Sequence, residues 1–252
     1  MSSMPVITKP PKSNAWKLKP NPIEGLYPGL EHLEGMDSIF MKQRIDTLEV
    51  ITGWQVKNKW KLADPVTGEM IAAFKEESDC CERQCCKNAR SFKADITDSQ
   101  GNVLFKMDRP WHCACMCCTS ACDGFCGQEI TTLNSNNQII SKAIQETSFV
   151  CDWKIAIYDE SNRLKYRLEN NICKATCCDV CYDKYLYLND VQGNQVGLVT
   201  KLKRGFCVEC CTPADNIHIQ FPRDATASDK AGIISAVLLT DYNIWEMQNQ
   251  QQ

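Results

Sequence analysis

Apolar and polar residues alternate along most of the chain between residues 60 and 221. In the clearest stretch, the alternating segments 153–157 and 164–168 lie on either side of the polar segment 159–162. Period-two alternation interrupted by turns rich in Asn, Asp and Gly is typical of antiparallel β-hairpins. The pattern predicts five hairpins in succession, with their turns at 64–68, 98–102, 134–137, 159–162 and 189–194.

Two strands are expected outside the hairpins, at 47–52 and 216–221, which makes about twelve in total. Twelve antiparallel strands leave unpaired edges unless the sheet closes on itself. A closed barrel of that size has an interior too wide for its own side chains to fill. Ahead of these strands, apolar residues recur near helical spacing, which predicts a short helix over residues 31–46.

The most continuous apolar run lies near the C-terminus, at residues 231–240, and it is apolar on every helical face. Such a helix must be surrounded either by protein or by lipid. A membrane span needs about 20 apolar residues, and extending this run brings in Asp241 and Asn243. A buried helix that fills the barrel is therefore favoured over a membrane segment. The residues expected to fill the barrel are Ala231, Ile233, Ile234, Val237, Leu238 and Leu239.

These elements predict one mainly β domain with short flanking segments. Residues 1–30 contain several prolines and few apolar residues, which indicates an extended, flexible lead-in. Residues 31–246 form the domain, a closed antiparallel barrel of about twelve strands around a central buried apolar C-terminal helix. Residues 247–252 form a polar tail.

Composition narrows the classes of function. The net charge of −3 argues against nucleic-acid binding, which needs a clear cationic excess. The 18 cysteines are the exceptional feature of the chain. No signal-peptide pattern is visible at the N-terminus, so we expect a reducing compartment, where disulfides are disfavoured. Metal binding, acylation, redox chemistry and simple burial are the remaining explanations for the cysteines.

Each group of cysteines follows one of the hairpins, and no cysteine lies in a hairpin turn. If the sheet meanders, the tight turns lie at one end of the barrel, and the cysteines gather at the other. The pairs at 178–181 and 207–210 have the CxxC spacing of zinc or iron–sulfur ligands. The dense run 113–118, which follows Trp111, suggests S-acylation, since two or more acyl chains anchor a protein stably. Burial as small hydrophobic residues is the third interpretation.

Three motifs resemble those of the phospholipid scramblases: the segment 79–86 with its paired cysteines, Arg109-Pro110 followed by the run 113–118, and 219–222 before the apolar helix. The resemblance extends over roughly residues 27–246. It implies a twelve-stranded barrel around a central helix, similar to the tubby C-terminal domain. The implied activity is Ca²⁺-dependent, ATP-independent movement of phospholipids between membrane leaflets. The resemblance also implies palmitoylation of the cysteine run, here Cys113, Cys115, Cys117 and Cys118.

The Ca²⁺-binding segment of that family aligns with residues 213–224, where Pro213 stands at a position expected to be acidic. Asp215, Asn216 and Asp224 remain as oxygen ligands, whereas Ca²⁺ takes about six to eight oxygens. We therefore expect weak Ca²⁺ binding. If the segment between them is an extended strand, Asp215 and Asp224 lie near opposite ends of the barrel and do not share one ion.

The leading hypothesis is a lipid-anchored scramblase-family protein at the cytoplasmic face of the plasma membrane. Its partners would be membrane phospholipids, with Ca²⁺ as regulator, and no covalent chemistry is implied, so we do not expect an enzyme. The alternative is a palmitoylated adaptor that binds lipid headgroups or proteins, or self-associates, without moving lipid. A third hypothesis is a metalloprotein that holds Zn²⁺ through its cysteine clusters.

Overall fold

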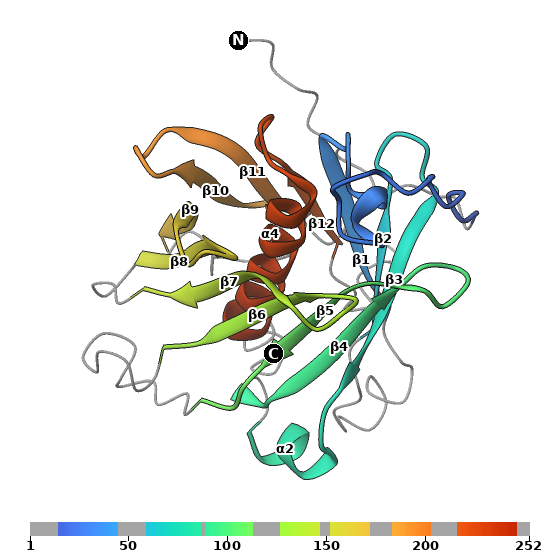
Figure 1. Ribbon diagram of the computed structural model, residues 1–252. Helices are drawn as coiled ribbons and strands as arrows, with labels where there is room; N and C mark the ends of the chain where they lie inside the picture. The colour runs from blue at the N-terminus through green and yellow to red at the C-terminus, as the bar shows by residue number, and fades with distance from the viewer. Residues whose placement is uncertain are drawn as a thin grey trace.

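The computed structural model describes residues 15–44, 59–86, 89–112, 127–146, 152–171, 183–202 and 216–245. Within these residues, twelve antiparallel strands close into one barrel around a long helix, as predicted (Figure 1). Each strand pairs with its neighbours in the chain, and β12 pairs with β1 to close the barrel. The strands are β1 (Ser38–Arg44), β2 (Lys59–Ala63), β3 (Met70–Glu77), β4 (Phe92–Thr97), β5 (Val103–Arg109), β6 (Glu129–Asn134), β7 (Ile139–Gln145), β8 (Asp152–Asp159), β9 (Leu164–Asn171), β10 (Lys184–Asp190), β11 (Gln195–Lys201) and β12 (Asn216–Gln220).

The five predicted hairpins are all present, and their tight turns share one local chemistry. Each turn begins with an Asp or Asn whose side chain accepts a hydrogen bond from the backbone N–H two residues further on. Such a side chain substitutes for the missing backbone partners of the turn. The hairpins are therefore specified locally. The turn-initiating residues are Asp64, Asp98, Asn134, Asp159 and Asp190.

The helix predicted over residues 31–46 is wrong. Only the short turn η1 (Leu30–His32) is helical there, residues 33–37 belong to no helix or strand, and β1 occupies residues 38–44. The alternation of β1 is hidden because both of its faces carry apolar residues. Ile39 and Met41 face the barrel interior, whereas Phe40 is buried on the outside in a small cluster with Ala63 and Leu202. The strand predicted at 47–52 lies outside the described residues, and β1 fills its place in the count of twelve.

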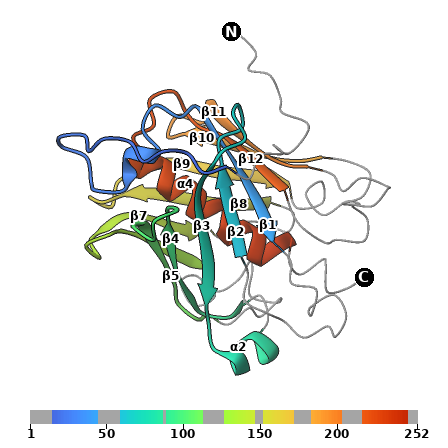
Figure 2. The ribbon, with the colours of Figure 1, turned by 90° about the vertical axis from the view of Figure 1, so that its right-hand side faces the viewer.

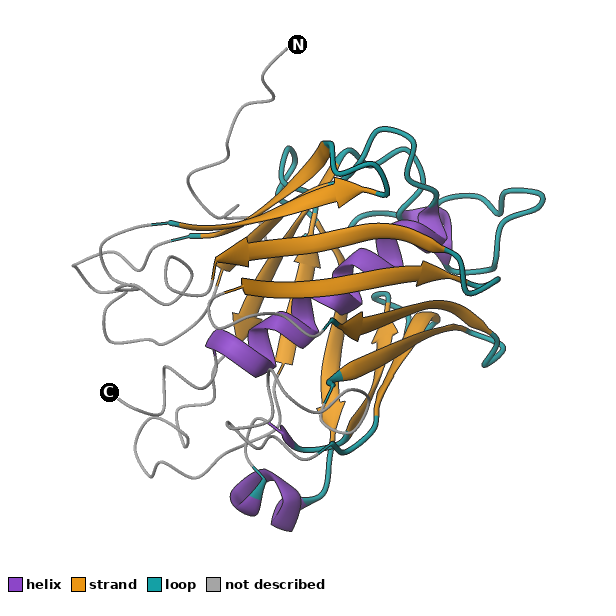
Figure 3. Ribbon diagram, turned by 90° about the vertical axis from the view of Figure 1, so that its left-hand side faces the viewer, coloured by secondary structure: helices purple, strands orange, loops and turns teal. Residues whose placement is uncertain are grey.

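The C-terminal helix α4 (Ala227–Thr240) runs lengthwise through the barrel (Figures 2 and 3). It begins at a capping box, in which Thr226 and Asp229 satisfy each other's backbone N–H groups. It continues into a single π-helical turn, η4 (Asp241–Trp245). The predicted buried helix is confirmed, because the residues expected to fill the barrel are 0% exposed: Ala231, Ile233, Ile234, Val237, Leu238 and Leu239.

The helix packs closely against the strands β6, β7 and β8. At Gly232 a Cβ atom would lie 2.2 Å from Oγ of Ser141 on β7, so glycine allows the close approach. The polar groups of the helix are also satisfied inside the barrel, since the Thr132 hydroxyl donates to Ser235 Oγ at 2.7 Å. None of the helices in the described ranges combines the length and the apolar character needed to cross a membrane.

Candidate functional site at the cysteine-bearing end of the barrel

The two ends of the barrel differ in chemistry. The five tight turns lie at one end, and the strand ends that flank the longer connections lie at the other (Figure 2). We call this second end the cysteine rim, defined by helix α2 (Cys80–Cys85) and the strand ends Glu77, Phe92, Arg109 and Glu129. Every cysteine in the described part of the chain lies here, in α2 and directly after it.

Helix α2 presents free thiols to solvent. Cys80, Cys81 and Cys85 are exposed, and Cys86 is half-buried. The described residues contain no group of three or more His, Cys, Asp or Glu side chains placed to hold a metal ion. In the described part of the chain, these four thiols are therefore accessible to solvent and are not grouped around one ion.

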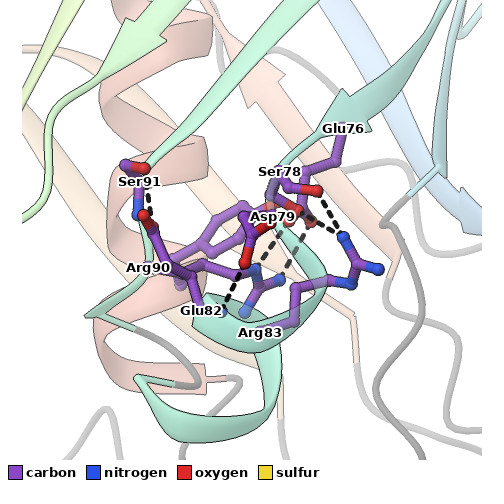
Figure 4. Close-up of polar contacts among 8 residues, drawn as sticks. Glu76, Ser78, Asp79, Glu82, Arg83, Arg90 and Ser91 are labelled. Carbon is purple, nitrogen blue, oxygen red and sulfur yellow. Dashed lines mark hydrogen bonds and ion pairs between the residues drawn. The ribbon is translucent and has the colours of Figure 1, made fainter.

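Polar contacts cap the first turn of α2 and attach it to the residue before β4 (Figure 4). The Asp79 side chain caps the helix by accepting from the N–H groups of Cys81 at 2.7 Å and Glu82 at 3.1 Å. These hydrogen bonds, with that from Glu82 first, hold the pKa of the Asp79 carboxyl below its usual range. The Glu82 carboxylate in turn accepts from the hydroxyl of Ser91, just before β4, at 2.7 Å. The short helix is thus fixed by its own polar residues.

A buried ion pair lies beneath α2. Arg90 donates from Nε to Glu76 Oε1 at 2.6 Å and from Nη2 to Glu76 Oε2 at 2.9 Å, and the two side chains are 1% and 0% exposed. The Ser78 hydroxyl also donates to Glu76, and Arg83 donates to the Ser78 carbonyl at 2.5 Å (Figure 4). A bidentate pair with further hydrogen bonds is the arrangement in which a buried charge is tolerated.

The end of the central helix joins the same network. The Tyr242 hydroxyl donates to Glu76 Oε2 at 2.8 Å, and its ring stacks on Phe92 with centroids 4.7 Å apart. The guanidinium groups of Arg90 and Arg109 lie 4.7 and 5.4 Å from the Tyr242 ring centroid. Arg109 also donates from Nη2 to Asn243 Oδ1 at 2.8 Å. The rim and the end of the helix that fills the barrel are therefore one connected unit.

In the chain, the predicted acylation site follows Arg109 at the end of β5 and precedes Glu129 at the start of β6, and both of these strand ends belong to the cysteine rim. Cys113, Cys115, Cys117 and Cys118 themselves are outside the described residues. Before them, Trp111 is 53% exposed although its neighbour Arg109 is completely buried. An exposed Trp beside candidate acylation sites fits a surface that meets a membrane interface, where Trp side chains are enriched. The acylated cysteines remain a prediction.

The predicted Ca²⁺ ligands do not converge in the part that the structure describes. Asn216 begins β12 at the cysteine rim, whereas Asp224 is exposed beyond the other end of that strand. At about 3.3 Å per residue, β12 separates the two positions by more than about 13 Å. Asp215 lies outside the described residues, as do the CxxC pairs at 178–181 and 207–210 that were considered for zinc. Within the described residues, Asn216 and Asp224 therefore do not lie together as ligands of one ion, and Ca²⁺ binding by this segment stays a prediction.

The buried network of Glu76, Arg90 and Tyr242 was not predicted from the sequence. The sequence contained one sign of it, because Glu76 is two residues after Phe74 in β3 and therefore lies on the same, inward face of the strand. A carboxylate on the core face of a strand requires a buried partner. Its partner Tyr242 is 166 residues away in the chain and could not be identified from local patterns.

Comparison with known proteins agrees with this architecture. Residues 18–247 match the family model described as Scramblase. Human phospholipid scramblase 1 is 33% identical over 239 residues, covering 94% of this chain and 72% of the relative. Human phospholipid scramblase 2 is 31% identical over 247 residues, covering 97% of this chain and 80% of the relative. No solved structure gives a significant match. With almost the whole barrel inside the matched region, the chain belongs to the scramblase family.

Proposed function

We propose that this protein moves phospholipids between the leaflets of a membrane without ATP, as a lipid-anchored protein on the cytoplasmic face of the plasma membrane. The proposal is supported by the match to the phospholipid scramblases, whose names state that activity. Movement of lipid down its gradient needs no covalent step, so no catalytic residues are assigned.

One structural observation carries the mode of membrane attachment. The only strongly apolar run considered as a membrane segment, α4, is enclosed by the barrel. Contact with the membrane is therefore assigned to the cysteine rim, with its exposed thiols and Trp111. Acylation of Cys113, Cys115, Cys117 and Cys118 would supply the anchor, because two or more acyl chains give stable attachment.

The anchor is tested by replacing these four cysteines together with Ala and separating membranes from cytosol. We expect the variant to move to the cytosol and to lose incorporation of a palmitate analogue. A matched variant with Cys80, Cys81, Cys85 and Cys86 replaced by Ala separates a specific effect from general loss of rim thiols. A quadruple variant that stays on membranes would show that the run 113–118 is not the anchor.

Lipid movement is tested with purified acylated protein in liposomes that contain a fluorescent lipid. We expect exchange between leaflets without ATP, and the same liposomes with and without Ca²⁺ test the Ca²⁺ dependence. Since Asn216 and Asp224 do not converge, alanine substitution of both should leave any Ca²⁺ response unchanged. If the Ca²⁺ response disappears in that variant, Asn216 and Asp224 do take part in Ca²⁺ binding and the reasoning is wrong.

A second function is favoured by the packing of α4. At Gly232 the helix packs so closely on β7 that no Cβ atom fits, which argues against a headgroup path through the described part of the barrel interior. An acylated adaptor that binds lipid headgroups or proteins, or self-associates, needs no such path. Anchored protein that exchanges no lipid in liposomes would support this function. Elemental analysis of the purified chain tests the remaining zinc hypothesis.

A further inference from the structure

Lysines gather on the outer face of three neighbouring strands, β1, β2 and β3, which face the viewer in Figure 2. Lys59 on β2 is directly opposite Lys75 on β3, and Lys42 on β1 is directly opposite Lys61 on β2. Like charges at directly opposite positions destabilise a sheet. Two such pairs lie side by side here. We call these four residues the lysine face.

A groove of about 310 Å³ lies on this face. Its volume falls at the lower end of the range for small-ligand sites, about 300–1,000 Å³. Its cations are Lys59, Lys61 and Lys75, and Ala73 and Thr97 provide small side chains between them. The small side chains therefore leave room between the ammonium groups, where a group of a ligand can enter from solvent.

Carboxylates border the groove on one side only. Glu77 follows Lys75 on the same face of β3, and Asp95 is opposite Lys75 on β4. Within the described part of the chain, Lys42, Lys61 and Lys75 form no ion pair, and the next lysine, Lys93, pairs with Asp108 instead. Among the described residues, Lys42 on β1 and Lys61 on β2 thus carry positive charges outside any ion pair, whereas Lys75 lies opposite Asp95.

The lysine face lies close to the cysteine rim. Lys59 is the first residue of β2, and Lys75 is two residues from the end of β3, where the chain enters α2. A membrane reached by acyl chains and Trp111 at the rim would therefore lie next to these lysines. Lysine ammonium groups near an anionic leaflet are attracted to its phosphates over about a Debye length.

We infer that the lysine face binds the phosphate group of anionic phospholipid headgroups and orients the barrel on the membrane. Lys59, Lys61 and Lys75 supply donors to the phosphate oxygens, while Glu77 and Asp95 accept from a headgroup ammonium or hydroxyl. This inference rests on one part of the proposed function, namely that the cysteine rim lies at a membrane. It does not require that lipid is moved.

The test uses the full-length chain produced without acylation, so that the lysine face is the main membrane contact. Sedimentation with phosphatidylcholine vesicles, with and without phosphatidylserine, measures partitioning at low and high salt. We expect binding that needs phosphatidylserine and weakens with salt. Each lysine near an anionic surface contributes about fivefold, so replacing Lys59, Lys61 and Lys75 together with Gln should lower partitioning on the order of 100-fold.

A matched control removes the same charge elsewhere on the barrel. The control replaces three outward lysines of β5, β7 and β8 with Gln: Lys106, Lys142 and Lys154. It should bind within about threefold of the parent, and circular dichroism should show that both triple variants are folded. Parent-like binding by the lysine-face variant, or an equal loss in the control, would overturn the inference.

Soluble glycerophosphoserine, a headgroup without acyl chains, distinguishes recognition of the headgroup in the groove from general attraction to the charged lipid surface. Competition at millimolar concentration supports recognition of the headgroup in the groove, and absence of competition with the same loss on vesicles supports attraction to the lipid surface. Because lipid exchange is not measured, a protein that moves no lipid would still give the expected partitioning. Failure of this inference is therefore distinguishable from failure of the proposed function.

Discussion

The contact between Tyr242 and Glu76 makes a quantitative prediction about what holds the end of the central helix in the barrel. Replacing Tyr242 with Phe removes one hydrogen bond to a charged acceptor, 2.8 Å long, and keeps the ring that stacks on Phe92. Hydrogen bonds to charged groups contribute about 1.5–3 kcal/mol. Glu76 keeps its donors from Arg90, so its carboxylate stays satisfied and the loss should be near 1.5 kcal/mol.

Replacing Glu76 with Ala should cost much more. Arg90 is 1% exposed, and the substitution removes the carboxylate to which its guanidinium donates two hydrogen bonds. Breaking a buried pair in this way costs about 3–5 kcal/mol. The two substitutions should also be coupled, because the hydrogen bond removed by Tyr242→Phe is already absent once Glu76 is gone.

Urea unfolding followed by tryptophan fluorescence measures both effects. With a slope of about 2–3 kcal/mol/M, a loss of 1.5 kcal/mol lowers the midpoint by about 0.6 M at unchanged slope. Tyr187→Phe is the matched control, since Tyr187 is 43% exposed on β10 and should change stability by less than about 0.5 kcal/mol. The reasoning is refuted if Tyr242→Phe behaves like the control, or if Glu76→Ala costs no more than Tyr242→Phe.

Three further predictions concern packing, pH and the short helix. Gly232→Ala should lower stability by about 1–3 kcal/mol in a thermal melt, because its Cβ would lie 2.2 Å from Ser141 Oγ. The control Gly127→Ala should be nearly neutral, because a Cβ atom there meets only ordinary van der Waals contacts. Burial lowers the pKa of His218 to about 4, so in the range between about pH 6.5 and 4 the unfolded chain binds one more proton than the folded chain. As the pH falls through this range, the free energy of unfolding should fall by up to about 1.4 kcal/mol per pH unit. This part of the pH dependence should vanish in His218→Leu, and its persistence would exclude His218 as the cause. Asp79→Ala removes the cap of α2, so the rate of thiol labelling of that helix should rise, while the free energy of global unfolding should fall by no more than about 2 kcal/mol.

Much of the fold could be predicted because its information is local. The turns that begin at Asp98 and Asp190 carry their own hydrogen-bond acceptors, and the strands beside them alternate in polarity. The failure over residues 31–46 has the opposite cause. Phe40 is apolar on the outer face because it packs against Ala63 on β2 and Leu202 directly after β11, so no local pattern marks β1 as a strand.

The candidate site was only partly predictable for the same reason. The position of the cysteines between hairpins placed the described thiols of α2 at one end of the barrel, as the structure shows. The pairing of Glu76 with Arg90 and Tyr242 depends on three segments that meet only after the barrel closes. The facing of Lys59 and Lys75 likewise depends on strand register, which hydrophobic alternation alone does not assign.

By itself, the sequence determined the number of hairpins, the chemistry of their turns and the presence of one helix that is apolar all round. These properties depend on neighbours a few residues apart. Only the tertiary structure decided where that helix lies. The all-round apolar pattern of α4 is compatible with lipid and with protein, its short length favours protein, and the closed ring of strands provides the interior that it fills. Closure also decided which charges face one another, because it joins β1 to β12 and brings the ends of distant strands to one rim.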